Sequence, residues 1–135
     1  MSDRQRAQAR IEVSRWDPNP YDQRPGAPEI VHVEVEETFS GDLSGQGRVR
    51  FLQVVAEDGS ASFVGIERFV GSLGGREGSF VLQDHGTLTA DGRVDGKWFV
   101  VPGSGSDGLE GLSGDGGFQA ELGQRAEVYL DYQLD

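Results

Sequence analysis

Short runs of alternating apolar residues, each closed by a glycine-containing turn, fill most of this 135-residue chain and limit what it can fold into. No window longer than a few residues has apolar side chains at the i, i+3, i+4, i+7 spacing of an amphipathic helix. Alternation with a period of two is typical of strands. The chain is therefore predicted to be all-β, as a single domain over residues 1–135 with a disordered N-terminal tail at residues 1–6.

Two turns set the expected register in the middle of the chain. Asp58-Gly59 and Gly74-Gly75 both predict two-residue hairpins, since a type I′ turn needs positive φ at both positions. The first turn would place Arg50 opposite Glu67, and the second would place Glu67 opposite Leu82. One face of the resulting sheet would contain Arg48, Arg50, Leu52, Val54, Phe63, Glu67, Phe69, Phe80, Leu82 and Asp84.

The opposite face of the same sheet is mainly aliphatic. It would contain Val49, Phe51, Val55, Val64, Ile66, Val70 and Val81. Because neither face is plainly polar, both faces need to be covered. This pattern predicts a small closed antiparallel barrel whose outer wall packs on another subunit.

Further strands are predicted on either side of this sheet, at Ala7–Trp16, Ile30–Phe39 and Arg125–Leu134. Residues 17–29 are predicted as a long connection, because Pro18 and Pro20 cannot donate ladder hydrogen bonds. Together with the strands above and one at 97–101, the count is seven or eight, enough to close a barrel.

The strand at Lys97–Val101 follows a third turn, Asp91-Gly92. The pattern leaves open whether Trp98 or Phe99 faces inward. His32, Glu34 and Glu36 alternate with three valines and are interpreted as a solvated face.

Charge and composition exclude several classes of function. The chain has 23 acidic and 12 basic side chains, a formal net charge of −11, which disfavours binding to nucleic acid or anionic membranes. No apolar run approaches the roughly 20 residues that span a bilayer, and the N-terminus lacks the apolar stretch of a signal peptide. A cytoplasmic location is expected. With no cysteine and only His32 and His85, no metal or cofactor is predicted.

Several longer motifs resemble a bacterial family, the domain-of-unknown-function family 3224. They are Ser14-Arg-Trp-Asp-Pro-Asn-Pro-Tyr-Asp, Thr38-Phe-Ser-Gly-Asp-Leu-Ser-Gly-Gln-Gly, Ala61-Ser-Phe-Val-Gly-Ile-Glu-Arg, Gly71-Ser-Leu-Gly-Gly-Arg-Glu-Gly-Ser-Phe-Val-Leu-Gln and the glycine-rich stretch Val100–Phe118. The resemblance implies a barrel similar to allene oxide cyclases and dirigent proteins, and a homo-oligomer. It also implies that Gly103–Phe118 is an ordered segment anchored by Leu109 and Leu112, although its composition is that of a linker.

The predicted face that combines phenylalanines with a few charged groups resembles the lining of a small-molecule pocket. In that pocket Glu67, Arg50 and Asp84 are the candidate catalytic residues, because a buried carboxyl serves as an acid or base and a guanidinium stabilises an oxyanion. The candidate ligand-binding residues are Phe63, Phe69, Phe80, Leu82, Arg48 and Trp98. The alternative is structural, with Arg50 and Glu67 as a cross-strand ion pair and the phenylalanines as core.

Two functional hypotheses follow. In the first, the barrel binds a small apolar organic molecule, and the likeness to allene oxide cyclase extends this to an isomerase or cyclase that holds its substrate in one folded conformation. In the second, the barrel is filled by its own side chains and is a non-catalytic oligomeric module. The volume of the interior separates the two hypotheses.

Overall fold

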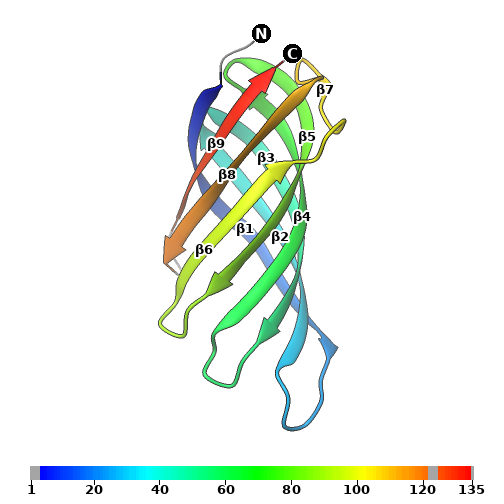
Figure 1. The fold of residues 1–135 in the computed structure, drawn as a ribbon, viewed down its shortest axis with the longest axis vertical. Helices are drawn as coiled ribbons and strands as arrows, with labels where there is room; N and C mark the ends of the chain where they lie inside the picture. Colours follow the sequence, from blue (N-terminus) through cyan, green and yellow to red (C-terminus); the bar gives the residue numbers. More distant parts are fainter. Residues whose placement is uncertain (1–3, 122–124, 135) are drawn as a thin grey trace.

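The chain forms a closed antiparallel barrel with one additional outer strand (Figure 1). The computed structural model describes residues 4–121 and 125–134. Its strands are β1 (Gln5–Asp22), β2 (Glu29–Gly41), β3 (Leu43–Val55), β4 (Ala61–Leu73), β5 (Arg76–Leu88), β6 (Arg93–Val100), β7 (Ser106–Asp107), β8 (Leu112–Glu121) and β9 (Ala126–Leu134). The order around the barrel is β4-β3-β2-β1-β9-β8-β6-β5, and the pairing of β4 with β5 closes it.

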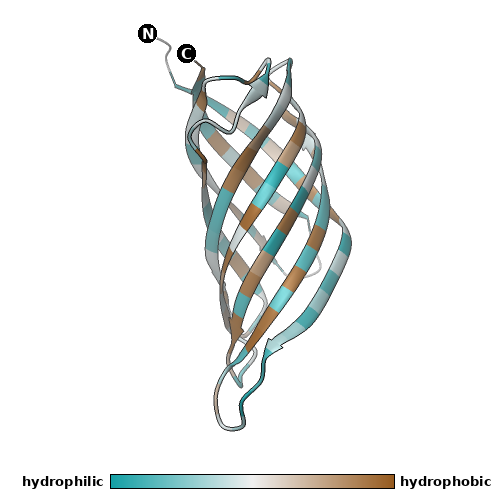
Figure 2. Ribbon diagram, turned by 90° about the vertical axis from the view of Figure 1, so that its right-hand side faces the viewer, coloured by the Kyte–Doolittle hydropathy of each residue, from teal (hydrophilic) through white to brown (hydrophobic). Residues whose placement is uncertain are grey.

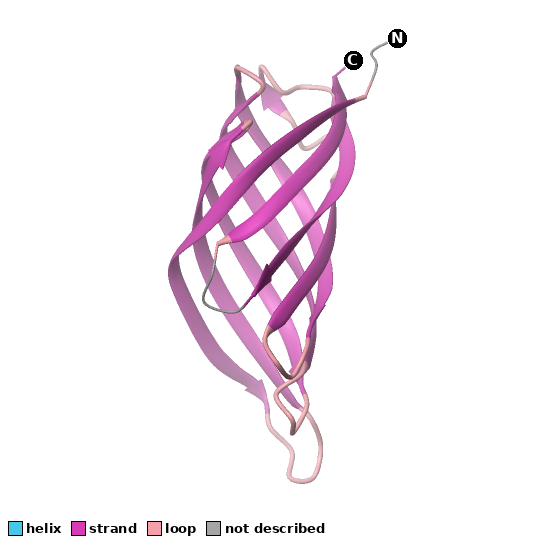
Figure 3. Ribbon diagram, turned by 90° about the vertical axis from the view of Figure 1, so that its left-hand side faces the viewer, coloured by secondary structure: helices cyan, strands magenta, loops and turns pink. Residues whose placement is uncertain are grey.

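The closed sheet confirms the predicted fold class. Each ladder is antiparallel, and β7 pairs only with β5, outside the closed ring. The described residues contain strands, turns and loops (Figure 3). Within residues 4–121 and 125–134, no helix has the length and apolar character needed to cross a membrane.

The first strand is longer than its prolines suggested. It begins at Gln5, inside the predicted tail, whose first three residues lie outside the described part of the chain. It continues to Asp22, so the predicted connection at 17–29 is wrong for residues 17–22, and the loop covers residues 23–28. Its ladder with β9 ends at Ile11, and beyond that point β1 pairs with β2 alone. Proline is tolerated there because one edge of the strand needs no ladder hydrogen bonds.

The β3–β4 hairpin corrects the predicted register by one residue. Gly59 N donates to the Ala56 carbonyl at 3.0 Å and Ala56 N donates to the Ser60 carbonyl at 2.8 Å, which makes a three-residue loop with Gly59 at φ +90°. Val49, rather than Arg50, therefore lies opposite Glu67. A shift of one residue moves every β3 side chain to the other face. Consequently Arg48, Arg50, Leu52 and Val54 point outward, whereas Val49 and Phe51 point inward.

The β4–β5 hairpin has the predicted register. Gly74 and Gly75 both have positive φ, 58° and 88°, and Leu73 lies opposite Arg76. This pairing places Phe69 opposite Phe80 and Glu67 opposite Leu82, as predicted.

The barrel interior is packed at the end near the two chain termini. The core at this end is formed by buried aromatic and aliphatic side chains, among them Phe39, Leu43, Phe69, Leu73, Phe80, Leu82, Trp98, Val100, Leu109, Leu112, Leu130 and Tyr132. The alternation of hydrophobic and hydrophilic residues along the strands is visible in Figure 2. Leu109 and Leu112 anchor the glycine-rich segment as predicted, and the open choice at the sixth strand is resolved, with Trp98 inward and Phe99 outward.

Candidate functional site

The half of the barrel away from the termini is hollow. It contains a cavity of about 910 Å³ that is bounded by residues of β1 to β6, β8 and β9. Much of its wall is apolar, with Val35, Phe51, Phe63, Leu88, Val94, Trp98, Phe118 and Ala120. Among the described residues, no strand pairs with β1 on the β9 side beyond Ile11, and Trp16, which lines the cavity on this part of β1, has 52% of its surface exposed. The interior is thus filled at one end and open at the other.

Three carboxyl groups are buried in the cavity wall. Glu37 on β2, Glu67 on β4 and Asp84 on β5 expose 8%, 0% and 2% of their surface. Neither oxygen of Glu67 nor Oδ1 of Asp84 accepts a hydrogen bond from an N–H or hydroxyl group of the described residues, and the Glu67 carboxyl lies within hydrogen-bonding reach of the Glu37 carboxyl. Buried polar atoms without partners are rare, because each costs about 1–3 kcal/mol.

A glycine on β3 allows the carboxyl of Glu67 to reach across that strand. Gly47 lies directly opposite Glu37 on β2, between the strands that hold the two glutamates. A Cβ placed on Gly47 would lie 2.2 Å from Oε2 of Glu67 and 2.7 Å from Cε1 of Phe39. The Glu67 carboxyl therefore occupies the space that a side chain at position 47 would fill.

Burial and mutual repulsion determine the ionisation of the three groups. Burial raises the pKa of Glu67 well above its ordinary value, and the charge of Glu37 raises it further. Burial also raises the pKa of Glu37, and a hydrogen bond with the Glu67 carboxyl offsets part of that rise. For Asp84, burial first and the charge of Glu37 second raise the pKa to about 8. Close carboxylates in a site with low dielectric cannot all ionise at neutral pH.

Aromatic rings connect the cavity to the packed half of the barrel. Phe51 contacts Phe63 at 5.2 Å between ring centroids, Phe63 stacks on Phe118 at 6.1 Å, and Phe118 lies 5.1 Å from Trp98. Phe63 and Phe118 pack over Gly86 and Gly96 of neighbouring strands, where a Cβ would lie within 2.7 Å and 2.2 Å of the rings. Because these inner positions are glycines, the large rings lie close to the barrel wall and leave the cavity unfilled.

The predicted site residues are divided among three places. Glu67, Asp84, Phe63 and Trp98 line the cavity, as expected of a pocket. Phe69, Phe80 and Leu82 point inward but belong to the packed core at the other end. Their predicted role as direct ligand contacts is therefore replaced by a structural one.

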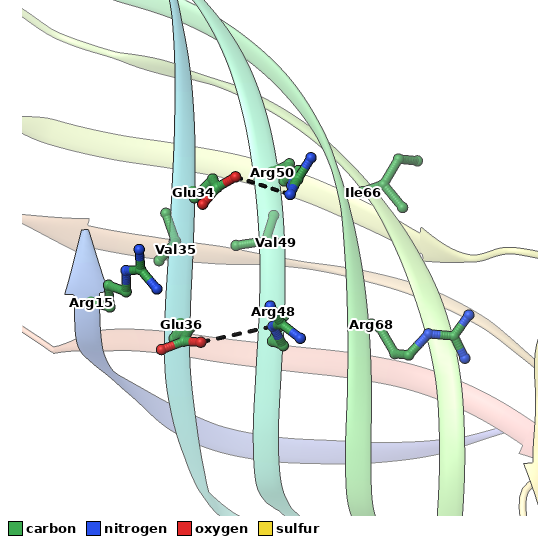
Figure 4. Close-up of a pocket in the computed structure, with 9 residues that line it drawn as sticks. All are labelled: Arg15, Glu34, Val35, Glu36, Arg48, Val49, Arg50, Ile66 and Arg68. Atoms are coloured by element: carbon green, nitrogen blue, oxygen red, sulfur yellow. Dashed lines mark ion pairs between the residues drawn. The ribbon is translucent and has the colours of Figure 1, made fainter. Parts of the chain in front are cut away.

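Arg48 and Arg50 do not belong to the cavity. Both lie on the outer wall, where Arg50 pairs with Glu34 at 2.9 Å and Arg48 with Glu36 at 3.8 Å (Figure 4). The prediction that Arg50 stabilises an oxyanion beside Glu67 is wrong, because the three-residue turn at Gly59 reverses the faces of β3. These arginines border a shallow outer pocket of about 260 Å³ instead.

Glu37 is a candidate site residue that was not predicted from the sequence. The signal was present, because Glu37 continues the alternation of Val31, Val33 and Val35 and precedes Phe39 on the same face. A carboxyl on an otherwise apolar face is unusual and points to a site. Within the described ranges, no group of three or more His, Cys, Asp or Glu side chains is arranged to hold a metal ion.

The fold and the cavity define a small antiparallel β-barrel protein with a partly hollow interior. The chain belongs to the family described as "Protein of unknown function (DUF3224)", whose model matches residues 7–132. It is similar to a solved structure of a DUF3224-family protein of unknown function from Shewanella oneidensis MR-1, with 29% identity and a TM-score of 0.81 over 98% of this chain and 99% of that one.

These comparisons confirm the predicted family and fold. No curated protein matches the chain. Neither the family model nor this solved structure bears on the expected likeness to allene oxide cyclases and dirigent proteins, which stays a prediction.

Proposed function

We propose that this chain binds a small, largely apolar organic molecule in the open half of its barrel, with the polar end of the molecule directed toward Glu37, Glu67 and Asp84. The observation that carries the proposal is the cavity of about 910 Å³ beside three buried carboxyl groups, of which Asp84 has an oxygen without a hydrogen-bond partner among the described residues. Binding pockets for small molecules have volumes of about 300–1,000 Å³, with an apolar wall and a few convergent polar groups. The alternative in which the barrel is filled by its own side chains applies only to the packed half.

The same arrangement supports the isomerase or cyclase hypothesis in one respect. A carboxyl whose pKa is raised to about 8, as for Asp84, holds a proton at neutral pH and serves as a general acid. An apolar cavity around it would restrict a flexible substrate to few conformations. Conformational restriction and one proton donor are the only catalytic effects that this proposal requires.

Binding of the neutral dye Nile red, whose fluorescence rises in apolar surroundings, tests the proposed function. The dye is expected to bind the wild-type chain in a one-to-one ratio. In the variant Ala120→Trp, an indole enters the cavity from β8, and the affinity is expected to fall on the order of tenfold or more. The matched control is Gln119→Trp, which adds the same side chain on the exposed face of β8. Equal binding by both variants, or no binding by the wild type, would overturn the proposal.

The outer wall favours self-association as an additional role. Leu52, Val54, Val64, Ile66 and Val70 are 42–57% exposed on the adjoining strands β3 and β4. Arg48, Arg50 and Arg68 lie beside them in a chain of net charge −11 (Figure 4). We propose a second copy of this chain as the partner, because an apolar patch with basic residues complements an acidic surface.

The mass in solution, measured by light scattering, tests this interface. The wild type is expected to have the mass of an oligomer, and Ile66→Glu is expected to have the mass of one chain, because it places a charge in the centre of the patch. Gln119→Glu, on the exposed face of β8, is the control and should not change the mass. A monomeric wild type would contradict the proposed interface.

A further inference from the structure

We propose that the polar end of the bound molecule is a protonated amine, so that the barrel takes an apolar or aromatic ammonium ion. This inference rests on the proposed function and names the chemical class of its ligand. Three features of the cavity support it: the carboxyl groups in its wall, the aromatic rings around them and the lack of N–H or hydroxyl donors to the deep carboxyl oxygens among the described residues.

The ionisable side chains of the cavity wall are almost all carboxyl groups. Glu37, Glu67 and Asp84 lie deep in the wall, and Glu12 and Glu121 also border the cavity. Arg125 is the basic residue among the described residues of the lining, and it pairs with Glu12 at 2.8 Å. No cationic side chain contributes to the pKa shifts of the three deep carboxyl groups. A cation in the cavity therefore favours ionisation of these carboxyl groups, whereas an anion raises the cost of ionising them.

Aromatic faces surround the same space. Trp98, Phe63, Phe118, Phe51 and Trp16 all border the cavity. The π-face of an aromatic ring attracts an ammonium group within about 6 Å, most strongly when water is excluded. Aromatic rings also pack well against an apolar ligand body. Rings together with carboxylates are a suitable surface for an organic cation.

The buried carboxyl oxygens favour a ligand that donates hydrogen bonds. Oδ1 of Asp84 has no hydrogen-bond partner among the described residues, and the oxygens of Glu67 have only the Glu37 carboxyl within hydrogen-bonding reach there. An ammonium group offers up to three N–H donors and a positive charge, which compensates the cost of ionising a buried carboxyl. A hydroxyl offers one donor and no charge. A ligand carboxylate offers neither donor nor positive charge.

Charge neutralisation predicts that the affinity for an amine rises with pH. The groups that face the cavity and ionise or carry charge are Glu12 on β1, Glu37 on β2, Glu67 on β4, Asp84 on β5, Glu121 on β8 and Arg125 before β9. The described lining residues of β3, β6 and β9 carry no charge. Because the raised pKa of Asp84 is about 8, loss of its proton between acidic pH and about pH 8 would strengthen the attraction for an ammonium ion.

Calorimetric titration with three ligands of one scaffold tests the inference. Naphthylethylamine, naphthylethanol and naphthylacetate share an aromatic body and differ in the polar end. The amine is expected to bind on the order of tenfold more tightly than the alcohol near pH 7, and the acetate more weakly than the alcohol. The amine affinity should rise with pH, and the alcohol affinity should not.

Variants test whether the deep carboxyl groups cause the preference for the amine over the alcohol. Glu37→Gln is expected to lower the amine affinity on the order of tenfold and to change the alcohol affinity less than about twofold. Asp84→Asn should likewise lower the amine affinity and leave the alcohol affinity nearly unchanged. It serves as the second variant if Glu37→Gln fails to fold. The matched control is Glu36→Gln, on the outer face of β2, which should change neither affinity.

The outcomes separate this inference from the proposed function. If the alcohol binds and the amine binds no more tightly, the amine inference is overturned while the proposed function stands. If none of the three ligands binds, both are overturned. If the amine preference persists in both Glu37→Gln and Asp84→Asn, the assignment to the buried carboxyl groups is overturned.

Discussion

The free energy of unfolding is expected to be higher near pH 5 than near pH 8, and to fall steadily between them. Glu37, Glu67 and Asp84 all have a pKa raised by burial, to about 8 for Asp84. In the unfolded chain carboxyl groups titrate near pH 4, so between these values the folded state holds protons that the unfolded state has lost. Raising the pH therefore favours unfolding, by up to about 1.4 kcal/mol per pH unit for each such proton.

The exposed carboxylates act in a different pH range. Hydrogen bonds from Ser60, Thr89 and Arg6 lower the pKa of Asp58, Asp91 and Asp131 respectively. Stabilisation from a lowered pKa is present above the unfolded value and is lost only as the pH falls through the folded value. These three groups therefore do not oppose the expected trend above about pH 5.

Urea denaturation at several pH values measures the fall in the free energy of unfolding with pH. One variant tests how much of this fall is due to Asp84. Asp84→Asn should remove the share of the slope due to one proton and should be more stable than the wild type near pH 8, since it replaces a costly buried carboxyl with a neutral amide. Asp95→Asn, on the exposed face of the neighbouring strand β6, should leave the slope unchanged. An identical slope in the wild type and Asp84→Asn would contradict the burial of Asp84.

The strands were predictable from sequence because alternation is a local signal. The error in register came from the turns. A two-residue type I′ turn needs positive φ at both central positions, which Gly74-Gly75 accepts without strain. In Asp58-Gly59 and Asp91-Gly92 only the glycine has positive φ, and each turn closes as a three-residue loop. The additional loop residue decides which face of β3 is inside.

The candidate site was predictable only in part, because its members meet across strands that are distant in sequence. Glu67 and Asp84 were placed on one face correctly because the Gly74-Gly75 hairpin fixes their relation. The approach of Glu67 toward Glu37 depends instead on closure of the barrel and on the absence of a side chain at Gly47. The volume of the cavity likewise depends on where inward side chains are small, which alternation does not encode.

The variant Gly47→Ala is expected to lower the free energy of unfolding by about 1–3 kcal/mol, as overpacking does elsewhere in cores. The added methyl would lie 2.2 Å from Oε2 of Glu67 and 2.7 Å from Cε1 of Phe39, so both side chains have to move. Gly47 lies in a regular strand with no left-handed φ, so backbone strain does not contribute. Urea denaturation at constant pH measures the change.

A double-mutant cycle with Glu67→Ala separates the two contacts. Without the Glu67 carboxyl, the methyl at position 47 collides only with the Phe39 ring, so Gly47→Ala should cost less by about 0.5–3 kcal/mol, the range seen for side chains in contact. Gly86→Ala is the control, because its added methyl would meet Phe63 and the backbone of β6 rather than Glu67. Its cost should be the same in both backgrounds. If Gly47→Ala is equally costly with and without the carboxyl, Glu67 does not lie over Gly47, and the approach of the two glutamates across β3 is wrong.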